Sequence, residues 1–461
     1  MTSAGLTPGK SSRAEVYCLD CVLCCRRRSP RLEYRMTTPT ERKPWAIYSP
    51  RQRWTYLAVL FLVSMSNYID RNVISVLLEP IKAEFQVSDT MLGLLTGLSF
   101  ALFYATLGIP VARWADRGDR RFIITVSLVI WSTMTALCGM AQSFWQLALA
   151  RVGVGAGEAG AIPPAQSLIA DYFDPAQRGR ALAIFMASAT AGYLIGFVLG
   201  AQIASAWGWR WAFILMGLPG LALAVVVRWV LREPRHLPEF RPAEAAQEPL
   251  TQTLRALFAK RSFVYLLAGM VIYFLISYGA TIFFPSYMIR VLQVPLATVG
   301  TAYGAVAAVA AVVGTLAGGF ITDRLARRNP AWLAWIPAAG LAVAWPAYEL
   351  MLLAPGFGTF LALSAIAGIT VNMTVPAMFA ALHAVCGSAR RALAVALMFF
   401  FANLIGLGLG PVISGALSDM FSAVHGAVGL RYALMLVLIL LLPGAWVMYL
   451  CGRQLPLDIE A

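Results

Sequence analysis

Twelve apolar runs set the strongest constraint on how this chain folds. Each is about 20 residues or longer, the length an α-helix needs to cross the hydrocarbon core of a bilayer. The runs cover 54–78, 90–112, 121–141, 145–170, 180–205, 209–231, 263–290, 297–322, 331–353, 357–384, 392–417 and 428–451. Hydrophobic residues make up 59% of the sequence and charged residues only 13%, which excludes an ordinary soluble domain. The pattern predicts an all-α membrane protein with twelve transmembrane helices and short loops.

The positions of the basic residues predict how these helices are oriented. The net charge is +14, and the basic residues gather in alternate loops. One set of loops holds Arg113, Arg117, Arg120, Arg121, Arg178, Arg180, Arg228, Arg232, Arg235, Arg241, Arg255, Lys260, Arg261, Arg324, Arg327, Arg328, Arg390 and Arg391. The other set holds only Lys82, Arg210, Arg290 and Arg431. Cytoplasmic loops carry the basic excess, so we expect both termini in the cytoplasm and the protein in the plasma (inner) membrane. Nucleic-acid binding is excluded.

Residues 1–53 precede the first span and are expected to form a largely disordered cytoplasmic extension. Four cysteines in this region have a spacing that resembles metal ligands: Cys18, Cys21, Cys24 and Cys25. No second ligand cluster and no surrounding soluble fold accompany them. We therefore favour a disordered extension or a mis-assigned start over residues 1–35, with Met36 opening the chain proper, and we expect no metal and no cofactor. No cleavable signal peptide is visible.

A polar segment at 232–262 divides the spans into two groups of six, 54–231 and 263–452, and a short cytoplasmic tail follows at 453–461. Two motifs recur in these groups. "ARWADRGDRR" (112–121) follows the second span and "GFITDRLARR" (319–328) follows the eighth; "GRALAI" (179–184) and "RRALAV" (390–395) open the fifth and eleventh. The offsets are 207 residues from Asp116 to Asp323 and 211 from Arg180 to Arg391. Two homologous six-helix bundles in parallel register explain this repeat.

Four ionisable residues lie deep in the predicted spans, and all are in the first half: Asp70, Arg71, Arg151 and Glu158. A charge at the centre of a transmembrane helix costs roughly 2.5–3.5 kcal/mol on insertion scales. The repeat offset maps "NYIDR" (67–71) onto the uncharged "SYGAT" (277–281). A purely structural device would be expected in both bundles, so the one-sided cluster indicates a functional role.

Helix geometry suggests how these charges pair. Arg151 and Glu158 are seven residues apart, hence on one face but roughly 10 Å apart along the axis. Counting from the span ends places Asp70 and Arg151 at a similar depth, which predicts that they pair. Arg71 lies about 100° around the helix from Asp70, so it is expected to face the cavity or Glu158. We interpret Glu158 and Asp70 as proton-coupling residues; the alternative for Glu158 is a permanent salt bridge with Arg71.

The Asp-Arg loop after the second span and its echo after the eighth resemble the signature loop of the major facilitator superfamily, although Ala112 stands where that loop usually opens with glycine. The resemblance implies two bundles that rock about a central site. It also implies a cytoplasmic gate built from the two loops, with candidate residues Asp116, Arg117, Arg120, Arg121, Asp323, Arg324 and Arg327. The simpler interpretation is that these arginines only anchor the topology.

Within the superfamily, "NYIDR" followed by "RVGVGAGEAGAIPPAQSLIADYF" (151–173) resembles the Spinster-type transporters, whose animal members export lysolipids and sphingoid phosphates. Organic-anion:proton symporters, which take up sugar acids, carry a similar charge pattern. By either resemblance Arg71 and Arg151 would bind a substrate anion. In the second half Tyr278, Asn372 and Asn403 are candidate cavity residues, with interhelical hydrogen bonding as the alternative.

The sequence therefore predicts a proton-coupled secondary transporter for a small anionic or amphipathic, lysolipid-like solute, working as a monomer. A sugar-acid or carboxylate symporter is the alternative, and a membrane sensor that does not transport is a more remote one. An enzyme is not expected, because no nucleophile with a base, metal cluster or phosphate-binding loop is present. The sequence leaves open whether the protein imports or exports, and whether it works by symport or antiport.

Overall fold

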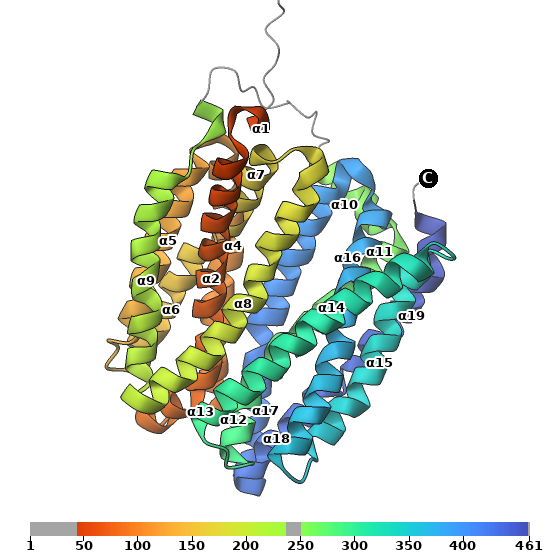
Figure 1. Ribbon diagram of the computed structural model, residues 1–461. Coiled ribbons are helices and arrows are strands. Elements are labelled where there is room, and N and C mark those ends of the chain that lie inside the picture. Colours follow the sequence, from red (N-terminus) through yellow and green to blue (C-terminus); the bar gives the residue numbers. More distant parts are fainter. Residues whose placement is uncertain (1–43, 237–249, 460–461) are drawn as a thin grey trace, which may run out of the picture. The chain divides into compact units, whose positions relative to one another are not determined.

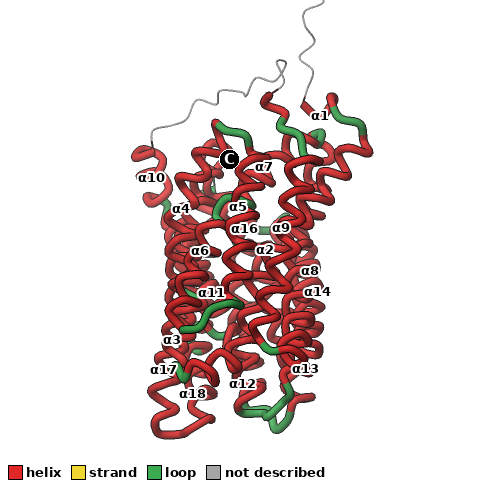
Figure 2. The backbone as a smooth tube through the Cα atoms, turned by 90° about the vertical axis from the view of Figure 1, so that its left-hand side faces the viewer, coloured by secondary structure: helices red, strands yellow, loops and turns green. Residues whose placement is uncertain are grey.

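Helices account for nearly all of the computed structural model, which describes residues 44–236 and 250–459. The described helices belong to one compact unit. The predicted N-terminal extension up to residue 43, with its four clustered cysteines, lies outside the described residues, as does most of the central linker. Figure 2 shows that the described elements are helices and loops, without a strand.

The first half consists of the following elements: α1 Pro44–Ile47, α2 Pro50–Phe85, α3 Asp89–Thr96, α4 Leu98–Arg117, α5 Arg120–Cys138, α6 Phe144–Glu158, α7 Ile162–Tyr172, α8 Pro175–Trp207, α9 Trp209–Val230 and the 3-10 turn η1 Pro234–His236. The second half consists of α10 Leu250–Ala259, α11 Arg261–Gly279, η2 Thr281–Phe283, α12 Phe284–Arg290, α13 Leu296–Thr298, η3 Val299–Tyr303, α14 Gly304–Ala326, α15 Trp332–Leu352, α16 Phe357–Phe401, η4 Ala402–Leu409, α17 Gly410–His425, η5 Gly426–Val428, α18 Gly429–Leu438 and α19 Leu441–Asp458.

Nine stretches of the described chain are long and apolar enough to cross a membrane. The last of them, Leu393–Asp458, runs for 66 residues and reverses direction at η5, so it holds two of the predicted spans. The remaining predicted spans correspond to α15 and to the pair α6 and α7, which a turn at residues 159–161 separates. The helices are therefore consistent with twelve spans, and the predicted all-α membrane fold is confirmed.

Local sequence explains where several helices begin and bend. Ser49 caps α2 in a reciprocal capping box with Gln52, and Pro50 follows at the first helical position. In α16, Gly387 has φ 67°, a left-handed conformation that favours glycine, and it separates the tenth span from the eleventh. The segments η3 and η4 are π-helical, a geometry often found at functional sites.

In Figure 1, α2, α5, α6 and α9 of the first half lie on the left, and α14, α15, α16 and α19 of the second half lie on the right. In the first half α2 packs on α8 and α5 packs on α9; in the second, α16 packs on both α14 and α15. Across the halves α3 packs on α17 and α4 on η4. One end of the unit carries α1 and α7, and the opposite end carries α12, α13 and α18 (Figure 1). We call the second of these the α12 end.

Candidate functional site

The centre of the site is an ion pair between Arg71 of α2 and Glu158 at the end of α6. The Nη2 and Nε atoms of Arg71 donate to the same carboxylate oxygen, Oε2, at 2.7 and 3.2 Å. The Glu158 side chain is fully buried, and that of Arg71 is 13% exposed. Arg71 is expected from the sequence to face the cavity or Glu158, and it does both: it contacts Glu158 and lines the cavity described below. The other oxygen of Glu158, Oε1, is buried without a hydrogen-bond partner among the described residues.

Arg151 and Asp70 lie side by side, as depth counting predicts, but the predicted ion pair is wrong. Nη1 of Arg151 donates to the main-chain carbonyl of Asp70 at 3.3 Å. Both carboxyl oxygens of Asp70 are buried, and neither has a hydrogen-bond partner in the described part of the chain. Counting residues fixes the height of a side chain in the membrane, whereas pairing also depends on its direction around the helix. Asp70 and Arg71 therefore have different surroundings, as expected.

A small cavity of about 50 Å³ borders these charges. Its lining comes from both halves: Arg71, Asn72, Ser75, Thr96, Phe100, Arg151, Tyr193, Phe197, Tyr278, Thr281, Ile282 and Leu407. Pockets that hold organic ligands usually measure about 300–1,000 Å³. An organic solute therefore requires the side chains or the halves to move apart. The wall combines two guanidinium groups with aromatic rings and aliphatic side chains.

Of the three residues predicted from the second half, Tyr278 lines this cavity and the two asparagines do not. Asn372 donates its amide to the carbonyl of Gly368, and Asn403 donates to the carbonyl of Phe399, at 2.8 and 2.7 Å. Both bonds run four residues back along their own helix. These amides are therefore engaged with the local backbone, and among the described residues neither donates to another helix.

Charged side chains join the two halves at the α12 end. Arg290 of α12 donates to Asp89 of α3 at 2.6 Å through Nη1 and to Glu79 of α2 at 2.6 Å through Nη2. Lys82 also contacts Asp89, at 2.5 Å. The Asp89 side chain is only 1% exposed and that of Arg290 is 14% exposed. Sequence analysis used Lys82 and Arg290 only as orientation signals and missed this cluster.

Next to this cluster, the second half completes the first turn of a helix in the first half. Asp419 of α17 accepts hydrogen bonds from the backbone N–H groups of Asp89 and Thr90, each at 2.8 Å. These are two of the N–H groups that the start of a helix leaves without an internal partner. A Cβ at Gly415 of α17 would lie 2.1 Å from the Asp89 carbonyl, so glycine permits this approach.

The candidate gate loop after the second span is held inside the first half. Arg120 is 1% exposed and forms ion pairs with Glu233 at 2.5 Å and Asp171 at 2.6 Å. Arg121 contacts Asp119 and the carbonyl of Leu231, both at 3.4 Å. The side chains of Asp116 and Arg117 lie outside what the structure describes. Glu233, at the start of the linker, was missed because it stands among other loop charges.

The repeated loop in the second half has a different environment. Asp323, Arg324 and Arg327 are exposed. Arg327 donates to the main-chain carbonyl of Asp323 at 2.9 Å, within its own helix. Arg120 and Arg327 stand at equivalent positions of the repeat, 207 residues apart, so equivalent arginines are buried in one half and exposed in the other.

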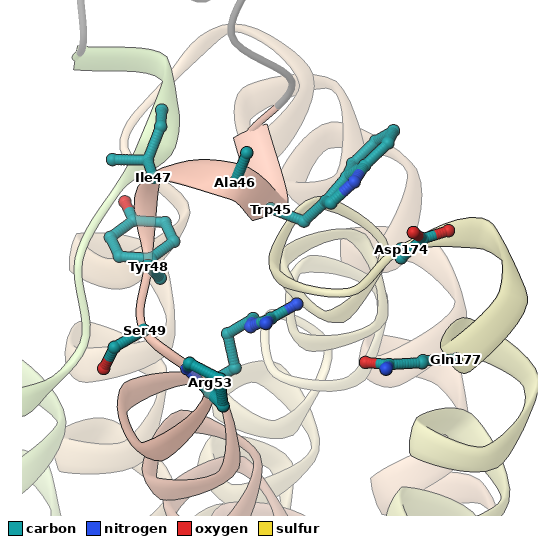
Figure 3. Close-up of a pocket in the computed structure, with 9 residues that line it drawn as sticks. Trp45, Ala46, Ile47, Tyr48, Ser49, Arg53, Asp174 and Gln177 are labelled. Carbon is teal, nitrogen blue, oxygen red and sulfur yellow. The ribbon is translucent and has the colours of Figure 1, made fainter.

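A second cavity, of about 590 Å³, lies where α1 meets the beginnings of α2 and α8. Figure 3 shows Arg53 pointing into it, with Gln177 and Asp174 on one side and Trp45 above. It shares helix α2 with the charge cluster but none of the residues that line the smaller cavity. The described residues contain no group of three or more His, Cys, Asp and Glu side chains placed to hold a metal ion.

Comparison with known proteins places the chain in a family. The sequence profile of the Major Facilitator Superfamily matches residues 60–351. The chain belongs to the major facilitator superfamily. This superfamily consists of membrane transporters, so the predicted transporter class is confirmed and the protein is not an enzyme.

Three members of the superfamily illustrate the similarity. An MFS-type efflux pump of Mycolicibacterium smegmatis is 36% identical over 89% of this chain and 95% of its own length. A "Probable L-galactonate transporter" of Escherichia coli (strain K12) is 27% identical over 80% of this chain and 84% of its own. A bacterial homolog of the human lysosomal transporter Spinster, solved in an inward-facing, unoccupied conformation, is 32% identical, with a TM-score of 0.82 over 90% of this chain and 100% of that chain. The predicted likeness to the Spinster-type branch is confirmed.

Proposed function

We propose that this member of the superfamily is a proton-coupled secondary transporter that moves a small anionic or amphipathic, lysolipid-like solute by alternating access. The observation that carries the proposal is the ion pair between Arg71, which lines the cavity, and the buried Glu158. A substrate anion that binds Arg71 competes with Glu158 for the same guanidinium. A proton on Glu158 weakens the ion pair and makes the Arg71 guanidinium available to the anion. Proton binding and anion binding are thereby coupled.

Asp70 supports proton movement at the same place. Its carboxyl group is buried, and both oxygens are without a hydrogen-bond partner among the described residues. An ionised carboxylate in such surroundings is costly, whereas a neutral carboxylic acid is much less so. The group is therefore suited to gain a proton in one conformation and release it in another. Glu158 and Asp70 are the proposed coupling residues, and Arg71, Arg151 and Tyr278 the proposed substrate contacts.

The closed α12 end supports alternating access as the mode of movement. The halves are joined there by Arg290, Asp89 and Asp419. We propose that this end faces outward and that both termini are cytoplasmic, because the basic loops follow the positive-inside rule in this orientation. We further propose that the protein works as a monomer in the plasma (inner) membrane, with the arginine-rich loops after the second and eighth spans as its cytoplasmic gate.

A proteoliposome assay tests this function. We expect an imposed pH gradient to drive flux of an anionic solute from a panel of lysophospholipids and sugar acids. Glu158→Gln should abolish the dependence on the gradient. Glu84→Gln should retain it, because Glu84 is a carboxylate of α2 that pairs with Arg210 at the surface. Flux that is independent of pH in the wild type, or unaffected by Glu158→Gln, would refute proton coupling through Glu158.

The second candidate is an organic-anion:proton symporter for sugar acids. The likeness to the L-galactonate transporter favours it. The same panel separates the two, because a lysolipid transporter requires the acyl chain and a sugar-acid symporter does not. Ligand binding without flux of any solute would instead favour a sensor.

A further inference from the structure

The ring of Phe100 lies close to both arginines of the charge cluster. The guanidinium carbon of Arg71 is 4.9 Å from the Phe100 ring centroid, and that of Arg151 is 5.5 Å from it. A cation within about 6 Å of an aromatic ring centroid is attracted by the negative face of the ring. Phe100 is 1% exposed, so water does not screen these contacts. One apolar side chain is therefore shared by both cations.

Phe100 is part of a larger aromatic group around Arg71. Tyr104, four residues further along α4, stacks on Phe100 with ring centroids 5.5 Å apart and planes at 18°. Its centroid is 4.8 Å from the Arg71 guanidinium carbon, and that of Tyr68 is 5.8 Å away. We call Tyr68, Phe100 and Tyr104 the aromatic cage. Arg71 thus has two kinds of partner: the Glu158 carboxylate and three rings.

The backbone next to Phe100 is placed by a glycine of the helix that carries both Arg151 and Glu158. A Cβ at Gly155 of α6 would lie 2.5 Å from the Phe100 carbonyl oxygen. Only glycine permits this approach. Gly155 therefore allows α4, and the Phe100 ring with it, to approach the charge cluster.

The internal repeat shows that the fold does not require these rings. With the 207-residue offset of the gate loops, Phe100 and Tyr104 of the second span fall on Ala307 and Ala311 of the eighth. The second half lacks the four intramembrane charges at the equivalent positions, and it lacks these two rings as well. The two rings therefore occur in the half that carries the charges and are not a general feature of the six-helix bundle.

We propose that Phe100 is a positioning residue that keeps Arg71 and Arg151 in the cavity wall while Glu158 is neutral. This inference rests on the proposed function and deepens it. With Glu158 ionised, its carboxylate holds Arg71. Once Glu158 is protonated, the two guanidinium groups repel each other in an environment of low dielectric. The Phe100 ring then supplies the attraction that retains both, so that the substrate anion meets a preformed pair of cations.

A double-mutant cycle in thermal stability tests this role without a substrate. Phe100→Leu removes the ring, and Glu158→Gln imitates the protonated carboxyl. We expect Phe100→Leu to lower the melting temperature by about 2–4 °C more in the Glu158→Gln background than in the wild type. Phe100→Tyr, which keeps an aromatic face, should behave like the wild type in both backgrounds.

Phe185→Leu is the matched control. Phe185 of α8 is fully buried, and its ring has no cation or aromatic contact among the described residues. Phe185→Leu should therefore lower the melting temperature equally in the wild type and in the Glu158→Gln background. Equal losses for Phe100→Leu in the two backgrounds would overturn the proposal, because a residue that only fills space does not respond to Glu158. Failure of the Phe100→Leu, Glu158→Gln double variant to fold, while the matching Phe185→Leu double variant folds, would count as the larger loss.

The same variants separate this role from the proposed function. Transport of lysophosphatidic acid or L-galactonate in proteoliposomes reports on function, whereas the stability cycle requires neither. If neither solute is transported but the two substitutions have a non-additive effect on melting temperature, the role of Phe100 is supported and the proposed substrate class is refuted. If one solute is transported and the two substitutions have additive effects, the role of Phe100 is refuted and the proposed function is not.

Discussion

The guanidinium of Arg290, in the second half of the chain, lies 2.6 Å from the carboxylate of Asp89, in the first half. The pair connects α12 to the beginning of α3 at the end where the halves meet. It is nearly buried, and the other ion-pair partners that the described residues offer are both in the first half: without Arg290, Asp89 keeps only Lys82, and without Asp89, Arg290 keeps only Glu79. The stability of the closed α12 end therefore depends on this contact.

Arg290→Gln is expected to shift the protein toward conformations in which the α12 end is open. Hydrogen bonds to charged groups contribute about 1.5–3 kcal/mol each, which corresponds to a shift of roughly tenfold or more. Distances between spin labels on the 139–143 and 353–356 connections measure the shift. Arg210→Gln is the control, because Arg210 pairs with Glu84 inside the first half. An unchanged distance distribution in Arg290→Gln would contradict this prediction.

Gly93→Ala is expected to weaken the same closure by a steric route. A Cβ at Gly93 of α3 would lie 2.2 Å from the carbonyl oxygen of Pro411 in α17. Overpacking of this kind costs about 1–3 kcal/mol, and here the cost falls on the closed conformation. Gly108→Ala is the matched control, because a Cβ there meets nothing within 4 Å. Spin-label distances at the α12 end distinguish the two, and equal effects of both substitutions would argue against a specific contact.

Equivalent arginines of the repeat should differ sharply in their effect on stability. Arg120→Gln leaves the fully buried Glu233 without its ion pair, and breaking a buried pair costs about 3–5 kcal/mol. Arg327→Gln removes an exposed side chain and should change stability by less than about 0.5 kcal/mol. Thermal unfolding in detergent compares the two variants. Similar melting temperatures would show that burial of Arg120 does not stabilise the protein.

Arg71→Lys is expected to impair anion binding although the charge is kept. Arg71 donates to Glu158 through two nitrogen atoms and faces the aromatic cage. Lysine offers a point charge without a planar face or a fork of donors. We expect the KM for the transported anion to rise by roughly tenfold, the effect of losing about 1.4 kcal/mol. Arg228→Lys, at an exposed position of α9, is the control, and an unchanged KM in Arg71→Lys would exclude a direct role for the guanidinium.

The sequence predicts the fold well because each span is a long apolar run, and chain length and hydropathy locate it without knowledge of its neighbours. It also identifies Asp70, Arg71, Arg151 and Glu158, because charges are rare and costly inside a membrane. It does not predict the direction of side chains around a helix. The expected Asp70–Arg151 ion pair therefore failed although the two residues are adjacent.

The sequence does not single out Phe100, Asp89 or Arg290, because each has the residue type expected at its position in a membrane helix. Phe100 is an apolar residue in an apolar helix, and nothing in its sequence context distinguishes it from a lipid-facing side chain. Asp89 and Arg290 stand at span ends, where charges usually reflect topology alone. Only their contacts across the two halves reveal a different role.

The capping of α3 by Asp419 makes the start of that helix depend on the partner half. Ser88 Oγ accepts from the N–H of Met91 within the same half, whereas the N–H groups of Asp89 and Thr90 rely on α17. When the α12 end opens, these two amides lose their acceptor and become available to water. Their hydrogen-exchange rates are therefore a label-free measure of how often the transporter opens at that end.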